Sequence, residues 1–234
     1  MPLILNIETA TETCSVALSN KNIILDFREN SEGKSHASLL TVFIEDIMKT
    51  NNITAKDLDA VAVSMGPGSY TGLRIGVSVA KGICYGSSRP LIAVPTLQSM
   101  VVGLLTRYLN SADVIADSWL CPMIDARRLE VYTSFYNSNF EEKSTTKAEI
   151  INDTSFQEYL NERKIIFFGN GSTKCAEIIK HSNASFYNDF KPSACDMMAI
   201  SEKLFYYQSF QNVAYFEPYY LKDFVSTTPK NKIF

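Results

Sequence analysis

The chain has 234 residues, of which 46% are hydrophobic and 20% are charged, and its formal net charge is −3. This composition is typical of a globular protein, and it excludes intrinsically disordered, collagen-like and disulfide-scaffold classes. No short segment gathers five or more lysine and arginine residues. We therefore expect no tight binding of RNA or DNA by the chain alone, because the basic surface that releases counterions is missing.

The N-terminus lacks the features of a secretory signal, because Met1–Leu5 has no basic lead and Glu8 follows closely. No apolar run approaches the roughly 18 residues that span a bilayer. The sequence therefore predicts a cytoplasmic protein without a membrane segment.

Cysteine and histidine usage argues against metal or redox chemistry. The five cysteines are mutually distant and form no C-x-x-C pair, which favours buried free thiols in a reducing cytosol over a redox or metal role. His36 and His181 lie too far apart for an H-E-x-x-H or H-x-x-x-H motif. No Gly-x-Ser-x-Gly elbow is present, although a Ser/His/Asp or Cys/His site assembled across the fold stays an alternative.

The first half of the chain predicts a strand, an antiparallel hairpin, and then helices that alternate with strands. Ser35 is a candidate cap for the first helix, and Pro95 opens the third. The expected strands cover 3–7, 14–19, 23–28, 59–64 and 91–94, and the expected helices cover 35–51, 70–85 and 95–109.

The second half follows a polar break at 110–118. Its expected strands cover 119–125, 130–136 and 165–168, and its expected helices follow Gly169–Gly171 and cover 193–210, whereas 137–153 has no clear pattern. Both halves resemble one α/β unit of strands and flanking helices. We therefore expect two subdomains, 1–109 and 110–225, followed by a loose tail at 226–234.

Glycines are concentrated in one place, because six of the ten fall between Gly66 and Gly86. In a helix over 70–85, Gly72, Gly76 and Ala80 form one stripe, and Ser78, Gly82 and Gly86 form a second. Each interior glycine costs about 1 kcal/mol relative to alanine, so several together indicate that close backbone approach is needed. One stripe can pack on the chain's own sheet, and the second suggests a second neighbour.

Three segments carry a resemblance to a known family. They are the strand and turn from Leu5 to Leu18, the glycine segment Gly66–Gly76, and Ile124–Arg128 with the following Glu130–Tyr132. Pro218–Leu221 is a fourth, weaker match. In these segments the chain resembles the TsaB (YeaZ) family of the actin-like ATPase (ASKHA) superfold. The resemblance implies an α/β fold of two similar subdomains, each with a mixed sheet flanked by helices, and a helix at 193–210 that packs back on the first subdomain.

The same resemblance implies a non-catalytic scaffold or activator subunit. Such proteins form a heterodimer with a TsaD-like subunit, which transfers a threonylcarbamoyl group to the adenosine beside the anticodon of tRNA. A TsaE-like ATPase joins the assembly, tRNA is met only through the complex, and the chain alone forms a homodimer. The competing hypothesis is a free-standing ATPase or small-molecule kinase of the same superfold.

The resemblance also implies that no metal or catalytic residue is present. The catalytic relative carries H-x-x-x-H where this chain has Thr96–Met100, and neither Thr96 nor Met100 offers an imidazole ligand. No cofactor is expected on this chain alone, although a nucleotide at the interface of the complex stays open. The weak candidates for nucleotide contact are Thr9, Thr11, Gly169 and Gly171. The turn that holds Thr9 lacks glycine and carries the acidic Glu12, which disfavours phosphate.

The partner interface implied by the resemblance lies on the helices 35–49 and 70–85. Its expected residues are His36, Leu40, Phe43, Tyr70, Gly72, Leu73, Gly76, Ala80 and Ile83. His36 is either an interface residue or an exposed neighbour of the cap, and Arg74 either forms a salt bridge across the interface or lies in solvent. Arg127 and Arg128, at a hairpin turn, are either solvated or touch tRNA phosphate in the full assembly.

Overall fold

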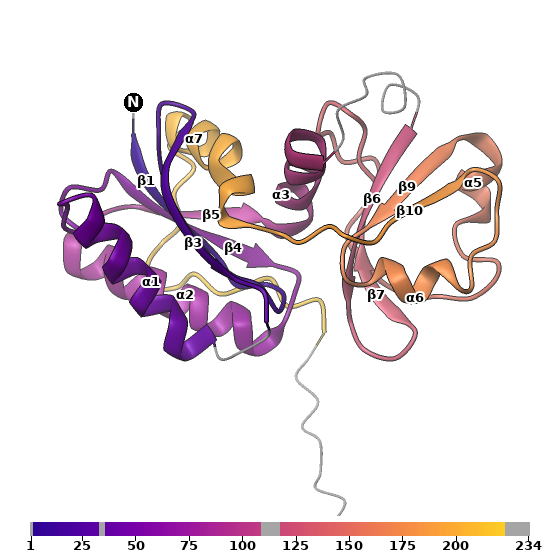
Figure 1. Cartoon of the computed structure of the whole chain (residues 1–234), viewed down its shortest axis with the longest axis horizontal. Coiled ribbons are helices and arrows are strands. Elements are labelled where there is room, and N and C mark those ends of the chain that lie inside the picture. The colour runs from indigo at the N-terminus through magenta and orange to yellow at the C-terminus, as the bar shows by residue number, and fades with distance from the viewer. Residues whose placement is uncertain (1, 33–35, 109–117, 223–234) are drawn as a thin grey trace, which may run out of the picture.

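The computed structural model describes residues 2–32, 36–108 and 118–222. Its strands form two five-stranded sheets, one in each half of the chain, which lie side by side (Figure 1). Each sheet has helices on both faces. Three predictions concern positions outside the described residues: the cap at Ser35, the boundary near residue 109 and the tail at 226–234.

The first sheet contains the strands of the N-terminal half in the order β3-β2-β1-β4-β5. β1, β2 and β3 form an antiparallel meander, whereas β4 and β5 run parallel to β1. The strands are β1 (Leu3–Glu8), β2 (Cys14–Asn20), β3 (Ile23–Asn30), β4 (Ala60–Gly66) and β5 (Leu91–Pro95), and the helices between them are α1 (His36–Thr50) and α2 (Tyr70–Ser87).

The second sheet repeats this topology in the order β10-β9-β6-β7-β8, with β6–β7–β8 antiparallel and β9 and β10 parallel to β6. The matching order in both halves agrees with the expected duplication. The strands are β6 (Ser118–Asp125), β7 (Glu130–Thr133), β8 (Lys147–Ile150), β9 (Lys164–Phe168) and β10 (Ala184–Tyr187), and the helices are α5 (Gln157–Glu162) and α6 (Ser172–Ala176).

The helical segment that follows each half packs on the sheet of the other half. α3 (Thr96–Gly103) continues into the π-helical turn η1 (Leu104–Tyr108), and its apolar residues pack on the second sheet. The 3-10 turn η2 (Ala194–Met197) and α7 (Met198–Tyr206) return to the first sheet, where they cover the face opposite α1 and α2. Figure 1 shows α3 between the sheets and α7 above the first one.

After α7, residues 207–222 run back along the first half of the chain; we call this segment the strap. Gln211 N donates to Leu91 O at 2.8 Å, so the strap covers the outer edge of β5. Lys81 Nζ donates to the carbonyls of Ala214 and Phe216 at 3.1 and 3.0 Å, which fixes the strap against α2. Its last described residue, Lys222, forms an ion pair with Glu130 at the start of β7.

Several elements differ from the sequence-based expectation. β7 ends at Thr133 rather than 136, and the helix expected over 193–210 ends at Tyr206. The unpatterned stretch 137–153 contains β8, in which Lys147 and Glu149 alternate with Ala148 and Ile150; a strand of only four residues is too short for this alternation to stand out in the sequence. The helices and strands of the first half lie within a few residues of where they were expected.

Candidate functional site: a docking face on two helices

The inner face of α2 packs on the turn between β1 and β2. A Cβ at Gly72 would lie 2.1 Å from the carbonyl oxygen of Thr9, and a Cβ at Gly76 would lie 2.2 Å from its hydroxyl oxygen. The loop before the helix makes the same approach, because Ser69 N donates to Ala10 O at 2.7 Å. Only glycine lets the helix backbone come this close to the turn.

This packing corrects one expectation about the glycine stripe. Gly72, Gly76 and Ala80 are all buried inside the chain, against the chain's own turn and sheet. Leu40 and Leu73, also expected at the interface, are fully buried in the core. The spacing correctly indicated close backbone approach, but the neighbour is part of the same chain.

The second stripe of α2 faces outward. A Cβ at Gly82 or Gly86 would meet no atom within 4 Å, and Ser78 is exposed between them and the helix start. Tyr85, on the same side, is 86% exposed. The small residues leave a low ridge that another helix could approach closely.

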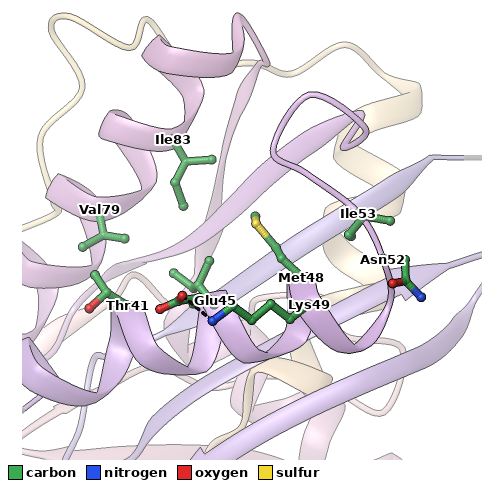
Figure 2. A pocket seen from close by; sticks show the side chains of 9 residues that line it. Thr41, Glu45, Met48, Lys49, Asn52, Ile53, Val79 and Ile83 are labelled. Atoms are coloured by element: carbon green, nitrogen blue, oxygen red, sulfur yellow. Dashed lines mark ion pairs between the residues drawn. The ribbon is translucent and has the colours of Figure 1, made fainter.

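A groove lies between α1 and α2, beside this ridge (Figure 2). Its volume is about 510 Å³, and its walls carry apolar side chains from both helices. In Figure 2, Val79 and Ile83 project from α2 toward Met48 of α1. The ion pair between Glu45 and Lys49, 2.6 Å long, lies on the rim. The lining residues are Thr41, Ile44, Glu45, Met48, Lys49, Asn52, Ile53, Val79 and Ile83.

A smaller hollow of about 310 Å³ lies on the other side of the ridge, between α2 and the strap. Tyr70 stacks on Tyr220 of the strap with ring centroids 4.7 Å apart, and the Arg74 guanidinium lies 5.4 Å from the Tyr70 ring centre. Arg74 therefore rests on an aromatic side chain of its own helix at the molecular surface. The outer face of α2 is thus flanked by an apolar groove and a mixed polar hollow.

The remaining expected interface residues lie around this face. Phe43 and Ile83 are half-buried, and Ile83 lines the groove. His36 is half-buried as well, and its Nε2 lies 2.8 Å from the carbonyl oxygen of Thr11, so the ring is held against the β1–β2 turn. The groove residues Thr41, Met48, Ile53 and Val79 were not expected at an interface, because apolar helical spacing alone does not separate them from core positions.

The two turns that carry the candidate nucleotide residues are joined by a hydrogen bond between Asn170 and Glu12. Asn170, between Gly169 and Gly171, donates from Nδ2 to Glu12 at 2.8 Å and accepts from Asp125 N at 3.0 Å. The turn at 169–171 is thereby tied to the β1–β2 turn of the first half and to the end of β6. Thr9 and Gly169 are packed tightly, since a Cβ at Gly169 would lie 2.5 Å from Met123 O.

Of the hydroxyls of Thr9 and Thr11 in the β1–β2 turn, that of Thr11 has a local partner, whereas that of Thr9 is buried without a hydrogen-bond partner among the described residues. Thr11 Oγ1 accepts from Thr13 N at 3.3 Å, and Thr9 N donates to Ser64 Oγ at 3.2 Å. Gly171 N donates to Met123 O at 3.0 Å. Contact of Thr9, Thr11, Gly169 or Gly171 with a nucleotide stays a prediction.

Glu8, at the end of β1, is a fully buried carboxylate. Its Oε1 accepts from Ala10 N at 2.6 Å, and within the described residues its Oε2 has no hydrogen-bond partner. Burial raises the pKa of Glu8 to about 7, because desolvation of the carboxylate outweighs the hydrogen bond from Ala10. A large fraction of the Glu8 carboxyl group is therefore protonated near neutral pH.

Asp196 is a second buried carboxylate on the same side of the sheet, and its charge raises the pKa of Glu8 further. Arg107 binds it through two nitrogens, with Nε–Oδ1 and Nη2–Oδ2 distances of 2.7 Å. Burial nevertheless raises the pKa of Asp196 to about 6, because the loss of water outweighs the guanidinium. This ion pair joins η1 to η2 between the two sheets.

Arg127 and Arg128 lie at the exposed turn between β6 and β7, and both have positive φ, 69° and 52°. Lys174 supports this turn from below by donating to the carbonyls of Arg128 and Glu130, at 2.8 and 2.6 Å. The turn thus presents two arginine side chains to solvent on a braced backbone.

Among residues 2–32, 36–108 and 118–222, no three His, Cys, Asp or Glu side chains gather in a way that could hold a metal ion. In the same part of the chain, no helix has the length and apolar character needed to cross a membrane.

Comparison with known proteins first defines the class. A family model described as "TsaD: tRNA N6-adenosine threonylcarbamoyltransferase" matches residues 29–230. The crystal structure "YeaZ from Pseudomonas aeruginosa" superposes with a TM-score of 0.76 at 22% identity, covering 94% of this chain and all of that one. An inorganic polyphosphate/ATP-glucomannokinase from Arthrobacter, with a TM-score of 0.50 at 10% identity, covers 87% of this chain and all of that one. The fold is therefore the actin-like ATPase fold.

Sequence similarity then defines the family. The chain is 31% identical to the tRNA threonylcarbamoyladenosine biosynthesis protein TsaB of Escherichia coli, over 95% of this chain and 96% of that one. It belongs to the TsaB (YeaZ) family, as the three motif segments predicted.

Proposed function

We propose that this chain is a non-catalytic subunit in the biosynthesis of threonylcarbamoyladenosine in tRNA, and that it binds a TsaD-like subunit through the outer face of α1 and α2. Membership of the TsaB family supports the pathway, since the Escherichia coli relative that matches along nearly the whole chain carries that name. The observation that carries the docking proposal is the apolar groove between α1 and α2, open beside the small-residue ridge of α2. An apolar groove of this kind fits the apolar face of a partner helix.

The partner's chemistry follows from the same surface. The groove walls offer Ile44, Met48, Val79 and Ile83, which a leucine- or isoleucine-rich helix could cover, and the Glu45–Lys49 pair can orient it from the rim. A homologous subunit with the same fold would present an equivalent helix pair. In the absence of that subunit a second copy of this chain can take its place, which accounts for the expected homodimer.

The assembly would also include a TsaE-like ATPase, and tRNA would be met only in the complex. A net charge of −3 and the scarcity of basic clusters disfavour tRNA binding by this chain alone, which supports contact with tRNA only in the complex. The cytoplasm, where tRNA is modified, is the compartment consistent with the free cysteines.

A reconstituted reaction tests the function. A TsaD-like subunit, the adenylate-forming enzyme, the TsaE-like ATPase and tRNA are combined with or without this chain, and modified adenosine is quantified. We expect modification to depend on the chain and the chain alone to turn over no ATP. Modification that proceeds equally without the chain, together with ATP turnover by the chain alone, would support the free-standing ATPase instead.

The docking surface is tested separately with Ile83→Asp, which places a charge in the groove. Loss of an apolar anchor and burial of an unpaired carboxylate should weaken binding of the TsaD-like subunit by about tenfold or more. Ile150→Asp is the matched control, because Ile150 is 68% exposed on β8, on the second sheet. Equal affinities of the two variants in calorimetry would place the interface elsewhere.

A further inference from the structure

β3 forms one free edge of the first sheet, since it is the terminal strand in the order β3-β2-β1-β4-β5. It also exposes three large apolar side chains: Ile23 is 59% exposed, Leu25 50% and Phe27 53%. A free edge with exposed apolar residues is a template for strand addition by another chain. The opposite edge of the same sheet is not open to strand addition in this way, because Gln211 of the strap hydrogen-bonds to Leu91 of β5.

The main-chain groups of Phe27 are already occupied by side chains of its two neighbours. Phe27 N donates to Asp26 Oδ1 at 2.9 Å, and Phe27 O accepts from Arg28 Nη1 at 2.8 Å. Arg28 and Asp26 also form an ion pair with each other, which closes a ring of contacts around the Phe27 backbone. Neighbouring side chains cannot reach between two paired strands, so these groups of Phe27 lie on the outer edge of β3.

The end of α1 holds both side chains in place. Asn51 Nδ2 donates to Asp26 Oδ2 at 3.1 Å, and Arg28 Nη2 donates to Thr50 Oγ1 at 3.3 Å. The carboxylate of Asp26 therefore has partners on both oxygens, one on the strand and one on the helix. Because α1 fixes the two side chains, the edge is covered without an additional strand or loop.

We propose that Asp26 and Arg28 act as a clip that closes the edge of β3 to strand addition, and that the occupant they exclude is β3 of a second copy. β3 is self-complementary in an antiparallel arrangement centred on Phe27. That register places Phe27 opposite its own counterpart, with the outward main-chain groups of the two copies facing each other. Once the clip is removed, an apolar cross-strand pair can therefore form at the centre of the junction. The inference does not depend on the proposed partner or pathway.

The test removes the clip and then blocks the edge again. Asp26→Ala/Arg28→Ala frees the Phe27 N–H and C=O, and we expect the weight-average mass in analytical ultracentrifugation to double relative to wild type at equal concentration. Adding Phe27→Pro should return the mass to the wild-type value, because proline has no N–H to donate and is tolerated on an edge strand. Lys147→Ala/Glu149→Ala is the matched control, since it removes an ion pair between alternate residues of another edge strand, β8.

Each outcome decides the proposal. A double variant with the wild-type mass, or an increase in mass that persists with Phe27→Pro, would overturn it. An equal increase in the β8 control would also overturn it, because loss of any edge ion pair would then suffice. If circular dichroism shows that the double variant is unfolded, the single variants Asp26→Ala and Arg28→Ala decide instead, since each frees one main-chain group of Phe27 and removes the ion pair. The wild-type mass in both single variants would overturn the proposal.

Discussion

Gly76 of α2 lies so close to Thr9 that a Cβ at position 76 would be 2.2 Å from the threonine hydroxyl oxygen. Thr9 is fully buried and β-branched, so its side chain cannot move aside without disturbing the β1–β2 turn. We expect Gly76→Ala to lower the free energy of unfolding by about 1–3 kcal/mol. Gly82→Ala in the same helix meets no atom within 4 Å and should raise it by up to about 1 kcal/mol. Urea denaturation of both variants measures the difference, and equal midpoints would contradict it.

A substitution at Gly82 can also distinguish an effect on partner binding from an effect on folding. Gly82→Trp adds a bulky side chain to the outer ridge of α2, where the free chain has room for it. We expect a thermal midpoint near that of the wild type but no heterodimer with a TsaD-like subunit in size-exclusion chromatography. Retained heterodimer would show that the ridge is not approached closely by a partner. Gly76 is unsuitable for this experiment, because a substitution there perturbs the fold itself.

Glu8 should make the stability of the chain depend on pH. Its pKa rises from 4.5 to about 7 on folding because of burial, so between these values the folded chain holds a proton that the unfolded chain has released. Stability therefore falls as pH rises from about 4.5 to about 7, by roughly 3 kcal/mol for this group, and is level above that. Asp196 contributes in the same direction at lower pH.

Glu8→Gln removes this effect, since an amide has no charge to desolvate. We expect the variant to gain stability relative to wild type as pH rises from 5 to 8. Urea denaturation of both proteins at each pH measures this difference in the free energy of unfolding. Comparison of the two proteins cancels the opposite trend of surface carboxylates with lowered pKa values, such as Glu45 and Asp57. Parallel pH profiles would mean that the Glu8 carboxylate is not desolvated in solution.

The arginine turn offers a test of tRNA contact. We expect Arg127→Glu/Arg128→Glu to weaken tRNA binding by the assembled complex about tenfold. The slope of the logarithm of the binding constant against the logarithm of the salt concentration should fall by the amount expected for the loss of up to about two phosphate contacts. Heterodimer formation should be unchanged, since both side chains lie on the second half of the chain, away from α1 and α2. Lys21→Glu, in the exposed turn between β2 and β3, is the control. If the double arginine variant and Lys21→Glu bind tRNA equally well, Arg127 and Arg128 do not contact tRNA and are simply solvated.

Much of the first half could be predicted from the sequence, because hydrophobic period and turn residues act locally. The helix at Tyr70 and the strand at Leu91 begin at the expected residues. The neighbour of the glycine stripe could not be predicted, because periodicity defines a face of a helix and not what covers it. Thr9, which occupies that face, precedes Gly76 by more than sixty residues.

Long-range polar contacts escaped prediction for the same reason. Arg107 and Asp196 are 89 residues apart, and nothing in either local sequence marks the other as its partner. The groove escaped notice because Met48 and Val79 occupy apolar helical positions that look like core. The family resemblance pointed to this pair of helices, and docking through them stays a prediction. Only the three-dimensional structure separates their inner residues from their outer ones.

The position of α7 has a consequence for how the protein is made. One face of the first sheet, with Ile4, Ala60 and Ile92 fully buried, is covered by residues from Ala194 onward. A ribosome synthesises the entire second sheet before those residues appear. The apolar face of the nascent first half therefore stays exposed, and the edge of β5 stays unpaired, until the residues from Ala194 to Gln211 have emerged. Cleavage of the chain between its halves should for this reason release a first half that aggregates, although its own strands and helices are complete.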